Sequence, residues 1–101
     1  MNVSSTLSGN AATLSLAGRF DFAAHRDFRG AYKPLLENPA VSDILIDFHQ
    51  VAYMDSSALG MLLLLRQGAD EAGKTVRLRP GESPVRKVLE IANFERLFGF
   101  A

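Results

Sequence analysis

The residues best suited to chemistry gather in one short segment, Asp55-Ser56-Ser57. A serine hydroxyl serves as the nucleophile of a hydrolase when a histidine and an aspartate activate it, or as an acceptor for a phosphoryl group. The chain has two histidines, His25 and His49, but it lacks the G-x-S-x-G sequence that exposes a nucleophilic serine on a strained turn. We therefore expect no enzymatic activity and consider the segment as a site of modification.

Metal and cofactor sites have little support in the sequence. The chain contains no cysteine, which excludes thiolate ligands, and its two histidines follow no ligand spacing. His49 follows a predicted strand and His25 lies near a predicted helix start, and both are ordinary settings for a solvated histidine. We expect neither a metal nor a cofactor.

Length and charge restrict the class of protein further. A chain of 101 residues with 48% hydrophobic residues supports one core, so we predict a single domain over 1–101. Eleven Lys and Arg balance eleven Asp and Glu, and the zero net charge argues against nucleic acid as a partner. The longest apolar run, Ala58 to Leu65, is far shorter than the roughly 20 residues of a membrane-spanning helix. With no visible secretion signal, we expect a cytoplasmic protein without direct membrane insertion.

The helices and strands that position the segment Asp55-Ser56-Ser57 can be predicted from the spacing of apolar residues along the chain. We predict an α/β fold: a mixed sheet of four to five strands, opened by an N-terminal hairpin, with three to four helices packed on it. The residues 94–100 form an apolar tail to which the pattern assigns no structure. The expected elements are a hairpin over 3–16 around a Gly-Asn turn, a helix over 28–36, a central parallel strand over 44–48, a helix over 56–72, a strand over 75–78, and a helix that begins with Ser83 as its cap.

The helix over 56–72 has an ordinary explanation for its polar start, because Asp and Ser are common helix-capping residues. Its outer face is less ordinary. At about 100° per residue, Leu59 and Leu63 fall on the solvent side, apart from the set predicted to face the sheet. That buried set is Ala58, Met61, Leu62, Leu65, Ala69 and Ala72.

Two leucines one turn apart, close to a surface serine, indicate a docking patch for a partner. A phosphoryl group on Ser56 adds about −1.5 to −2 charges beside that patch, at the positive end of the helix dipole. The fold tolerates this charge, whereas a partner packed on Leu59 and Leu63 does not. Phosphorylation is therefore predicted to expel the partner.

A resemblance supports the same interpretation. The run from Val51 to Gly60, VAYMDSSALG, resembles the phosphorylation-site segment of STAS domains, specifically of the anti-sigma-factor antagonists of bacterial partner-switching systems. The run from Gly18 to Asp21 resembles the family's loop after its second strand, and Ser83 to Ile91 is similar to its last helix. Ala58, where many members have glycine, and the aromatic Phe20 and Phe22 depart from the usual pattern.

The resemblance implies roles for individual residues. Ser56 is the implied phosphoacceptor and Ser57 the less favoured one. The residues implied or predicted to contact partners are Asp21, Asp55, Ser57, Leu59, Gly60 and Leu63. The implied partners are an anti-sigma factor that is also, or works with, a serine kinase of the histidine-kinase ATPase fold, and a PPM-type phosphatase that resets the switch.

One alternative shares the fold and differs in mechanism. A STAS subunit that is never phosphorylated, in a membrane transporter or a signalling scaffold, has the same architecture. The two hypotheses differ in whether Ser56 is phosphorylated.

Overall fold

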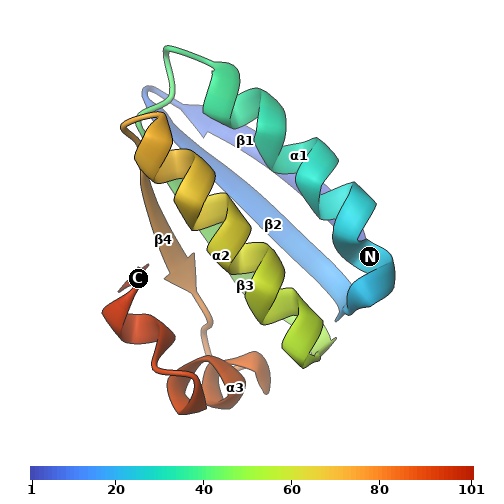
Figure 1. The fold of residues 1–101 in the computed structure, drawn as a ribbon. Coiled ribbons are helices and arrows are strands. Elements are labelled where there is room, and N and C mark those ends of the chain that lie inside the picture. Colours follow the sequence, from blue (N-terminus) through green and yellow to red (C-terminus); the bar gives the residue numbers. More distant parts are fainter.

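The computed structural model describes residues 1–101 as a five-stranded sheet with helices on it (Figure 1). The strands stand in the sheet in the order in which they occur in the chain, from β1 to β5. This arrangement confirms the predicted α/β fold. The elements are β1 (Asn2–Ser8), β2 (Ala11–Phe20), the 3-10 helix η1 (Phe22–Ala24), α1 (His25–Glu37), β3 (Asp43–Met54), α2 (Ser56–Glu71), β4 (Thr75–Arg79), α3 (Val85–Ile91), the 3-10 helix η2 (Phe94–Arg96) and β5 (Gly99–Phe100).

The sheet is mixed, as predicted. β1 and β2 form the opening hairpin and pair antiparallel, and Gly9 supplies the positive φ of +62° that the tight turn requires. The other three pairings, β2 with β3, β3 with β4 and β4 with β5, are parallel. β3 therefore lies at the centre of the sheet.

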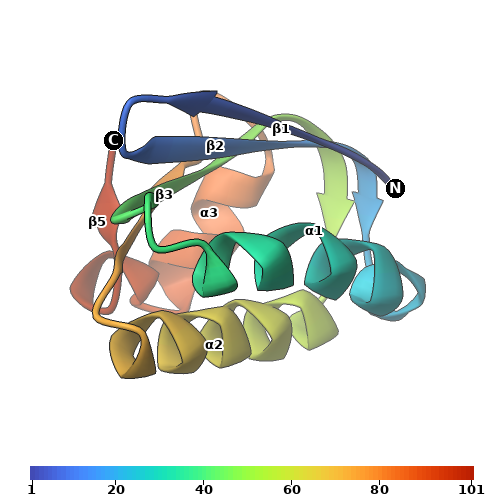
Figure 2. The same ribbon diagram turned by 90° about the horizontal axis from the view of Figure 1, so that it is seen from above.

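Helices α1 and α2 lie side by side on one face of the sheet (Figure 2). The core forms between them and the strands, around fully buried side chains such as Leu14, Ile46 and Leu62. In α1 the buried positions are Phe28, Tyr32 and Leu35, spaced as an amphipathic helix requires. The two helices approach closely where Gly68 of α2 meets Leu36 of α1: a Cβ on Gly68 would lie 2.8 Å from Leu36 Cδ1.

Several boundaries differ from the predicted ones. β3 runs on to Met54 instead of ending near Phe48, because it continues to pair with β2 up to Phe20. Ala72 was predicted to be buried, but it follows the last turn of α2 and is exposed.

The start of α3 is also different. Ser83 does not cap this helix; its hydroxyl donates to the Pro80 carbonyl at 2.7 Å, and α3 begins at Val85 without a side-chain cap. The apolar tail 94–100 turns through η2 and adds β5 to the edge of the sheet, with Phe94 and Phe98 buried.

None of the helices has the length and apolar character needed to cross a membrane.

Candidate functional site

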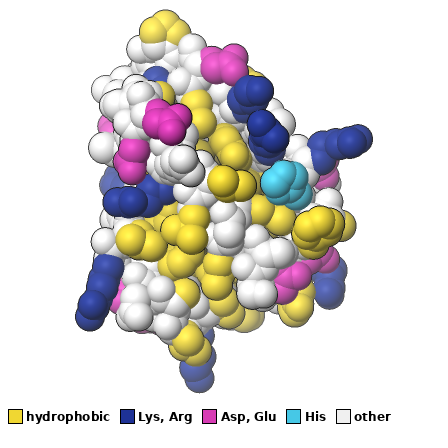
Figure 3. Space-filling model, in the orientation of Figure 1, with side chains coloured by type: hydrophobic (Ala, Val, Ile, Leu, Met, Phe, Trp, Pro, Cys, Tyr) yellow, Lys and Arg dark blue, Asp and Glu magenta, His cyan; other side chains and the backbone are white.

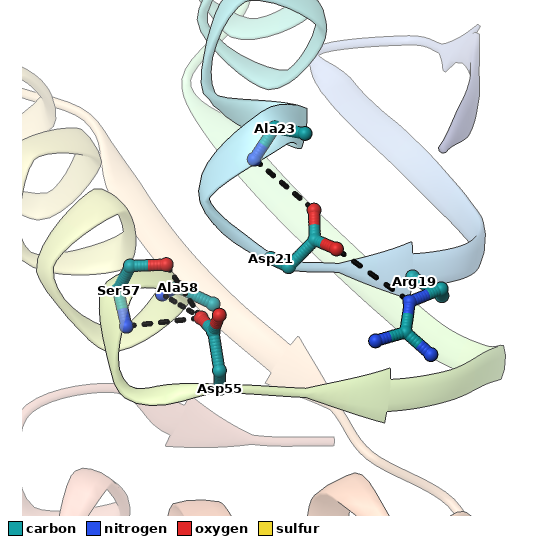
Figure 4. Close-up of polar contacts among 6 residues, drawn as sticks. All are labelled: Arg19, Asp21, Ala23, Asp55, Ser57 and Ala58. Carbon is teal, nitrogen blue, oxygen red and sulfur yellow. Dashed lines mark hydrogen bonds and ion pairs between the residues drawn. The ribbon is translucent and has the colours of Figure 1, made fainter.

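The centre of the site is the junction where β3 ends and α2 begins (Figure 4). Asp55 is the N-cap of α2, in extended backbone conformation. Its Oδ1 accepts hydrogen bonds from the backbone N–H groups of Ser57 at 3.0 Å and Ala58 at 3.4 Å. This carboxylate satisfies donors that a helix start otherwise leaves open, so the first turn of α2 is held in place.

The two serines of the first turn differ in what holds their hydroxyls. The Ser57 hydroxyl donates to Asp55 Oδ1 at 2.5 Å and is half-buried. Ser56 is exposed, and its hydroxyl makes no hydrogen bond within the chain. Ser56 therefore presents a free nucleophilic oxygen at the positive end of the α2 dipole, whereas Ser57 is engaged by the cap.

The cap also determines the ionisation of Asp55. The hydrogen bond from the Ser57 hydroxyl lowers the pKa of Asp55 most, and the N–H groups of Ala58, Ser57 and Phe22 lower it further, against a smaller opposing effect of desolvation. The carboxylate is thus stabilised as the anion. A second negative group on Ser56 would stand next to this charge, but at a helix end that favours anions.

A second loop lies against this junction. The Asp55 N–H donates to the Phe20 carbonyl at 3.3 Å, which ties the end of β3 to the end of β2. Asp21, the next residue, caps η1 by accepting from Ala23 N–H at 3.1 Å, and its Oδ2 lies 3.5 Å from Arg19 Nε (Figure 4). The structure thus brings the predicted pair Asp21 and Asp55 to the same end of the sheet.

The outer face of α2 continues from the serine. Leu63 is 43% exposed, in agreement with the prediction. Leu59 was predicted to be exposed as well, but it is partly buried and packs against the core. Gly60 is exposed, and a Cβ built on it would meet nothing within 4 Å. We call Ser56, Gly60 and Leu63 the α2 ridge.

Three large apolar side chains near the site were not predicted to be exposed. Leu64 is 52% exposed and lies on the α1 side of α2, Phe22 is 76% exposed, and Tyr53 is 42% exposed. The helical wheel held a signal for Leu64, because this position lies about 120° from the centre of the buried set. For Phe22 and Tyr53 the sequence held none, because Phe22 lies in the short helix η1 and the exposure of Tyr53 depends on the register of β3 beside β2.

Neither histidine takes part in the site. His49 Nδ1 lies 3.0 Å from Asp47 Oδ1, and His25 begins α1. Burial raises the pKa of Asp47, but hydrogen bonds from His49 and the nearby charges of His49 and Arg79 outweigh it, so the net shift is downward. No group of three or more His, Cys, Asp or Glu side chains could hold a metal ion.

Comparison with known proteins decides the family. A family model described as "Mlab, STAS domain" matches residues 3–99. The chain belongs to the STAS domain family. The family predicted from the residues is thereby confirmed.

Relatives of this STAS domain fall into more than one functional class. A STAS-domain containing protein of Pseudomonas aeruginosa is 46% identical over 90 residues, which cover 89% of this chain and 87% of the relative. The Bacillus anti-sigma factor antagonist SpoIIAA, solved in phosphorylated and unphosphorylated forms, is 20% identical in both, with TM-scores of 0.74 and 0.69. The matches cover 99% and 97% of this chain, and 91% and 99% of SpoIIAA.

The STAS domain of a SulP transporter from Vibrio cholerae also has this fold, with 23% identity and a TM-score of 0.71 over 95% of this chain and 77% of that domain. At these identities the solved structures establish the fold. The function depends on the site that this STAS domain itself presents.

Proposed function

We propose that this STAS domain is an anti-sigma-factor antagonist whose unphosphorylated form binds and sequesters an anti-sigma factor. Phosphorylation of Ser56 abolishes this binding. The γ-phosphoryl group of ATP is transferred to Ser56 Oγ, which loses its proton, and ADP leaves. The protein acts by binding, in the cytoplasm, and performs no catalysis of its own.

The observation that carries this proposal is the contrast between the two neighbouring serines. Ser56 is exposed and its hydroxyl is free, whereas the Ser57 hydroxyl donates to Asp55. A kinase that removes the Ser57 proton first has to break the hydrogen bond from this hydroxyl to Asp55, but at Ser56 it meets no such hydrogen bond. Ser56 is therefore the favoured phosphoacceptor and Ser57 the less favoured one.

Release of the partner follows from the position of Ser56 on the α2 ridge. A partner surface that packs on Gly60 and half-exposed Leu63 approaches the Ser56 hydroxyl within one or two helical turns. A phosphate there introduces about −1.5 to −2 charges. Burying that charge without a cation opposite it is more unfavourable than the packing of the apolar side chains is favourable.

The proposed partners are an anti-sigma factor that acts with, or as, a serine kinase of the histidine-kinase ATPase fold, and a PPM-type phosphatase that removes the phosphate. Asp21 and Asp55 lie at the same end of the sheet as Ser56 and contribute to the surface that the kinase contacts. Ser57 and Leu59 contribute less to the partner surface, because one is held by the cap and the other packs against the core.

Phosphorylation is the first test. Mass spectrometry of the protein recovered from its native cells, with and without the activating condition, should find phosphate on Ser56 whose occupancy changes with condition. The matched variants Ser56→Ala and Ser57→Ala should differ: the first removes the signal and the second leaves it. Persistent absence of phosphate from Ser56 would contradict the switch.

A substitution on the α2 ridge tests the binding surface. Leu63→Arg should abolish capture of the anti-sigma factor while the free energy of unfolding changes by no more than about 0.5 kcal/mol, as for other exposed positions. Copurification and urea unfolding measure the two quantities. A large loss of stability together with unchanged binding would place the docking surface elsewhere.

A second candidate function is a STAS subunit of a membrane transporter. The likeness to the STAS domain of a SulP transporter favours it. In that case Ser56→Asp and Ser56→Ala should bind the transporter equally well, since no charge switch exists. Under the proposed function Ser56→Ala stays competent to bind the anti-sigma factor, and Ser56→Asp loses affinity.

A further inference from the structure

The outer face of α1 carries positive charge that the chain does not neutralise. Arg26, Arg29 and Lys33 are all exposed, and none forms an ion pair within the chain. Four other arginines do have a carboxylate partner within 4.0 Å: Arg19, Arg66, Arg79 and Arg86. In Figure 3, Lys and Arg side chains and a histidine gather over α1, beside hydrophobic side chains over α2. We call Arg26, Arg29 and Lys33, with His25, the basic face.

This arrangement does not serve the helix itself. Arg29 and Lys33 are spaced i, i+4, where like charges repel, and Arg26 stands in the first turn of α1, where the helix dipole disfavours cations. The two acids of α1, Asp27 in its first turn and Glu37 at its end, form no ion pair with these cations. The basic face is therefore better explained by something outside the chain.

A groove runs between the basic face and α2. It is a hollow of about 280 Å³, lined on the α1 side by His25, Arg29 and Tyr32 and on the α2 side by Leu64, Gln67 and Glu71. A second, shallow hollow of about 330 Å³ adjoins it on α1, beside Gly30. The second hollow is open at Gly30, where a Cβ would meet nothing within 4 Å.

The two walls of this groove differ in chemistry. The α1 wall is cationic, whereas the α2 wall presents the half-exposed Leu64 between the polar Gln67 and Glu71. Glu71 is the only acid that lines the groove, and it lies in the last turn of α2. An occupant that matches both walls is therefore apolar where it meets Leu64 and negative toward α1.

We propose that the α1–α2 groove binds an acidic amphipathic helix of a protein partner, with its apolar stripe on Leu64 and its Asp and Glu side chains against Arg29 and Lys33. An apolar stripe flanked by charges complementary to the receptor is a recurrent form of helix-in-groove recognition. The inference rests on the proposed function to the extent that it names the chemistry of the same partner. It requires no phosphorylation.

The test uses a synthetic peptide, which isolates the groove from Ser56. The probe is a helical peptide of about 18 residues with leucines at i, i+3 and i+7 and glutamates on the flanking positions. A matched peptide has lysine in place of every glutamate. Backbone amide NMR of the full chain maps where each peptide binds and with what affinity.

We expect the acidic peptide to shift the amides of α1 and of the second half of α2, and to bind at least about tenfold more tightly than the basic peptide at low salt. The double variant Arg29→Glu, Lys33→Glu should invert this preference. The control Lys87→Glu on α3, also exposed and without an ion pair, should leave it unchanged. The spread of the amide spectrum checks that every variant is folded.

Three outcomes would overturn the proposal: equal affinity for both peptides, shifts confined to another face, or no binding of either peptide by the folded protein. A fourth would be equally decisive: binding to phosphatidylglycerol vesicles, but not to the acidic peptide, would identify the basic face as a membrane contact. Failure of peptide binding with intact switching at Ser56 would remove this proposal alone. An unmodified Ser56 with intact peptide binding would remove only the switch.

Discussion

Helix α2 contains two glycines whose surroundings are opposite. Gly68 lies against α1, and a Cβ there would come within 2.8 Å of Leu36 Cδ1. Gly60, two turns earlier, faces open space with nothing within 4 Å. Glycine weakens a helix interior by about 1 kcal/mol relative to alanine, so both positions destabilise α2. Only at Gly68 does the chain itself account for this loss, through the close approach of α1.

The different surroundings of Gly68 and Gly60 suggest different reasons for a glycine at each position. At Gly68 the missing side chain makes room for Leu36. At Gly60 the room remains empty, one turn from Ser56 and beside Leu63, where a partner backbone could approach closely. Under the proposed function, this open space is where the anti-sigma factor approaches α2.

The largest effect should follow from filling the space at Gly68. Gly68→Val places a branched side chain against the terminal methyl group of Leu36, which has to move, and should lower the free energy of unfolding by about 1 kcal/mol, the low end of the range for overpacking. The matched variant Gly60→Val should stay within about 0.5 kcal/mol of the parent. Urea unfolding measures both. Combining Gly68→Val with Leu36→Ala should recover part of the loss; without recovery, the contact with Leu36 is not the cause.

A smaller effect, of opposite sign, is expected at Gly60. Gly60→Ala should raise the free energy of unfolding by about 0.5–1 kcal/mol, because alanine is the better helix former and meets no neighbour. Its affinity for the anti-sigma factor should fall, because the new methyl group stands on the α2 ridge. Titration calorimetry with the unphosphorylated protein gives the affinity. Unchanged binding would mean that Gly60 lies outside the interface.

The smallest effect concerns the turn that precedes Gly60 and depends on pH. The pKa of Asp55 is lowered in the folded protein, chiefly by the Ser57 hydroxyl, so the stability contributed by its ionised form is complete above about pH 4 and is lost as pH falls through the lowered value. Because Asp55 is open to solvent, this contribution is modest. Asp55→Asn should lack it.

Urea unfolding of the parent and of Asp55→Asn over a pH series tests this expectation. The difference between the two should be constant from neutral pH to about pH 4 and shrink at lower pH. Asp47, whose pKa is also lowered, is present in both proteins, so its contribution to the pH dependence cancels in the difference. A difference that does not change below pH 4 would show that the first turn of α2 is not held by the Asp55 anion.

Much of the fold follows from local patterns. The hairpin with its turn at Gly9, the amphipathic spacing in α1 and the buried run in β3 all form as the residues predict, because burial of one face imposes each pattern. Two features do not follow from such patterns. β5 exists only because β4 offers an edge, and Ser83 donates to a carbonyl within its own loop instead of capping α3.

The candidate site likewise combines features that could be predicted from the sequence with features that could not. The resemblance implied that Asp21 and Asp55 share a surface with Ser56, and in the structure both aspartates follow strands, β2 and β3, that end on the same side of the sheet. Only the resemblance distinguished Ser56 from Ser57; the local sequence could not, because the difference between their hydroxyls depends on which oxygen reaches the Asp55 carboxylate. The prediction that Leu59 is exposed was wrong. A helical wheel shows which face of α2 points to the sheet, but it does not show that a residue at the border of that face is partly buried.

The agreement between strand order in space and strand order in the chain has a consequence for biosynthesis. Every strand pairs with the strand made just before it, and no strand inserts between two earlier ones. A chain emerging from the ribosome therefore meets each partner already in place, beginning with the β1–β2 hairpin. Each closing step spans only the intervening helix and its loops, which limits the entropy lost in ring closure. The sheet grows outward at a single edge, and its last addition is β5.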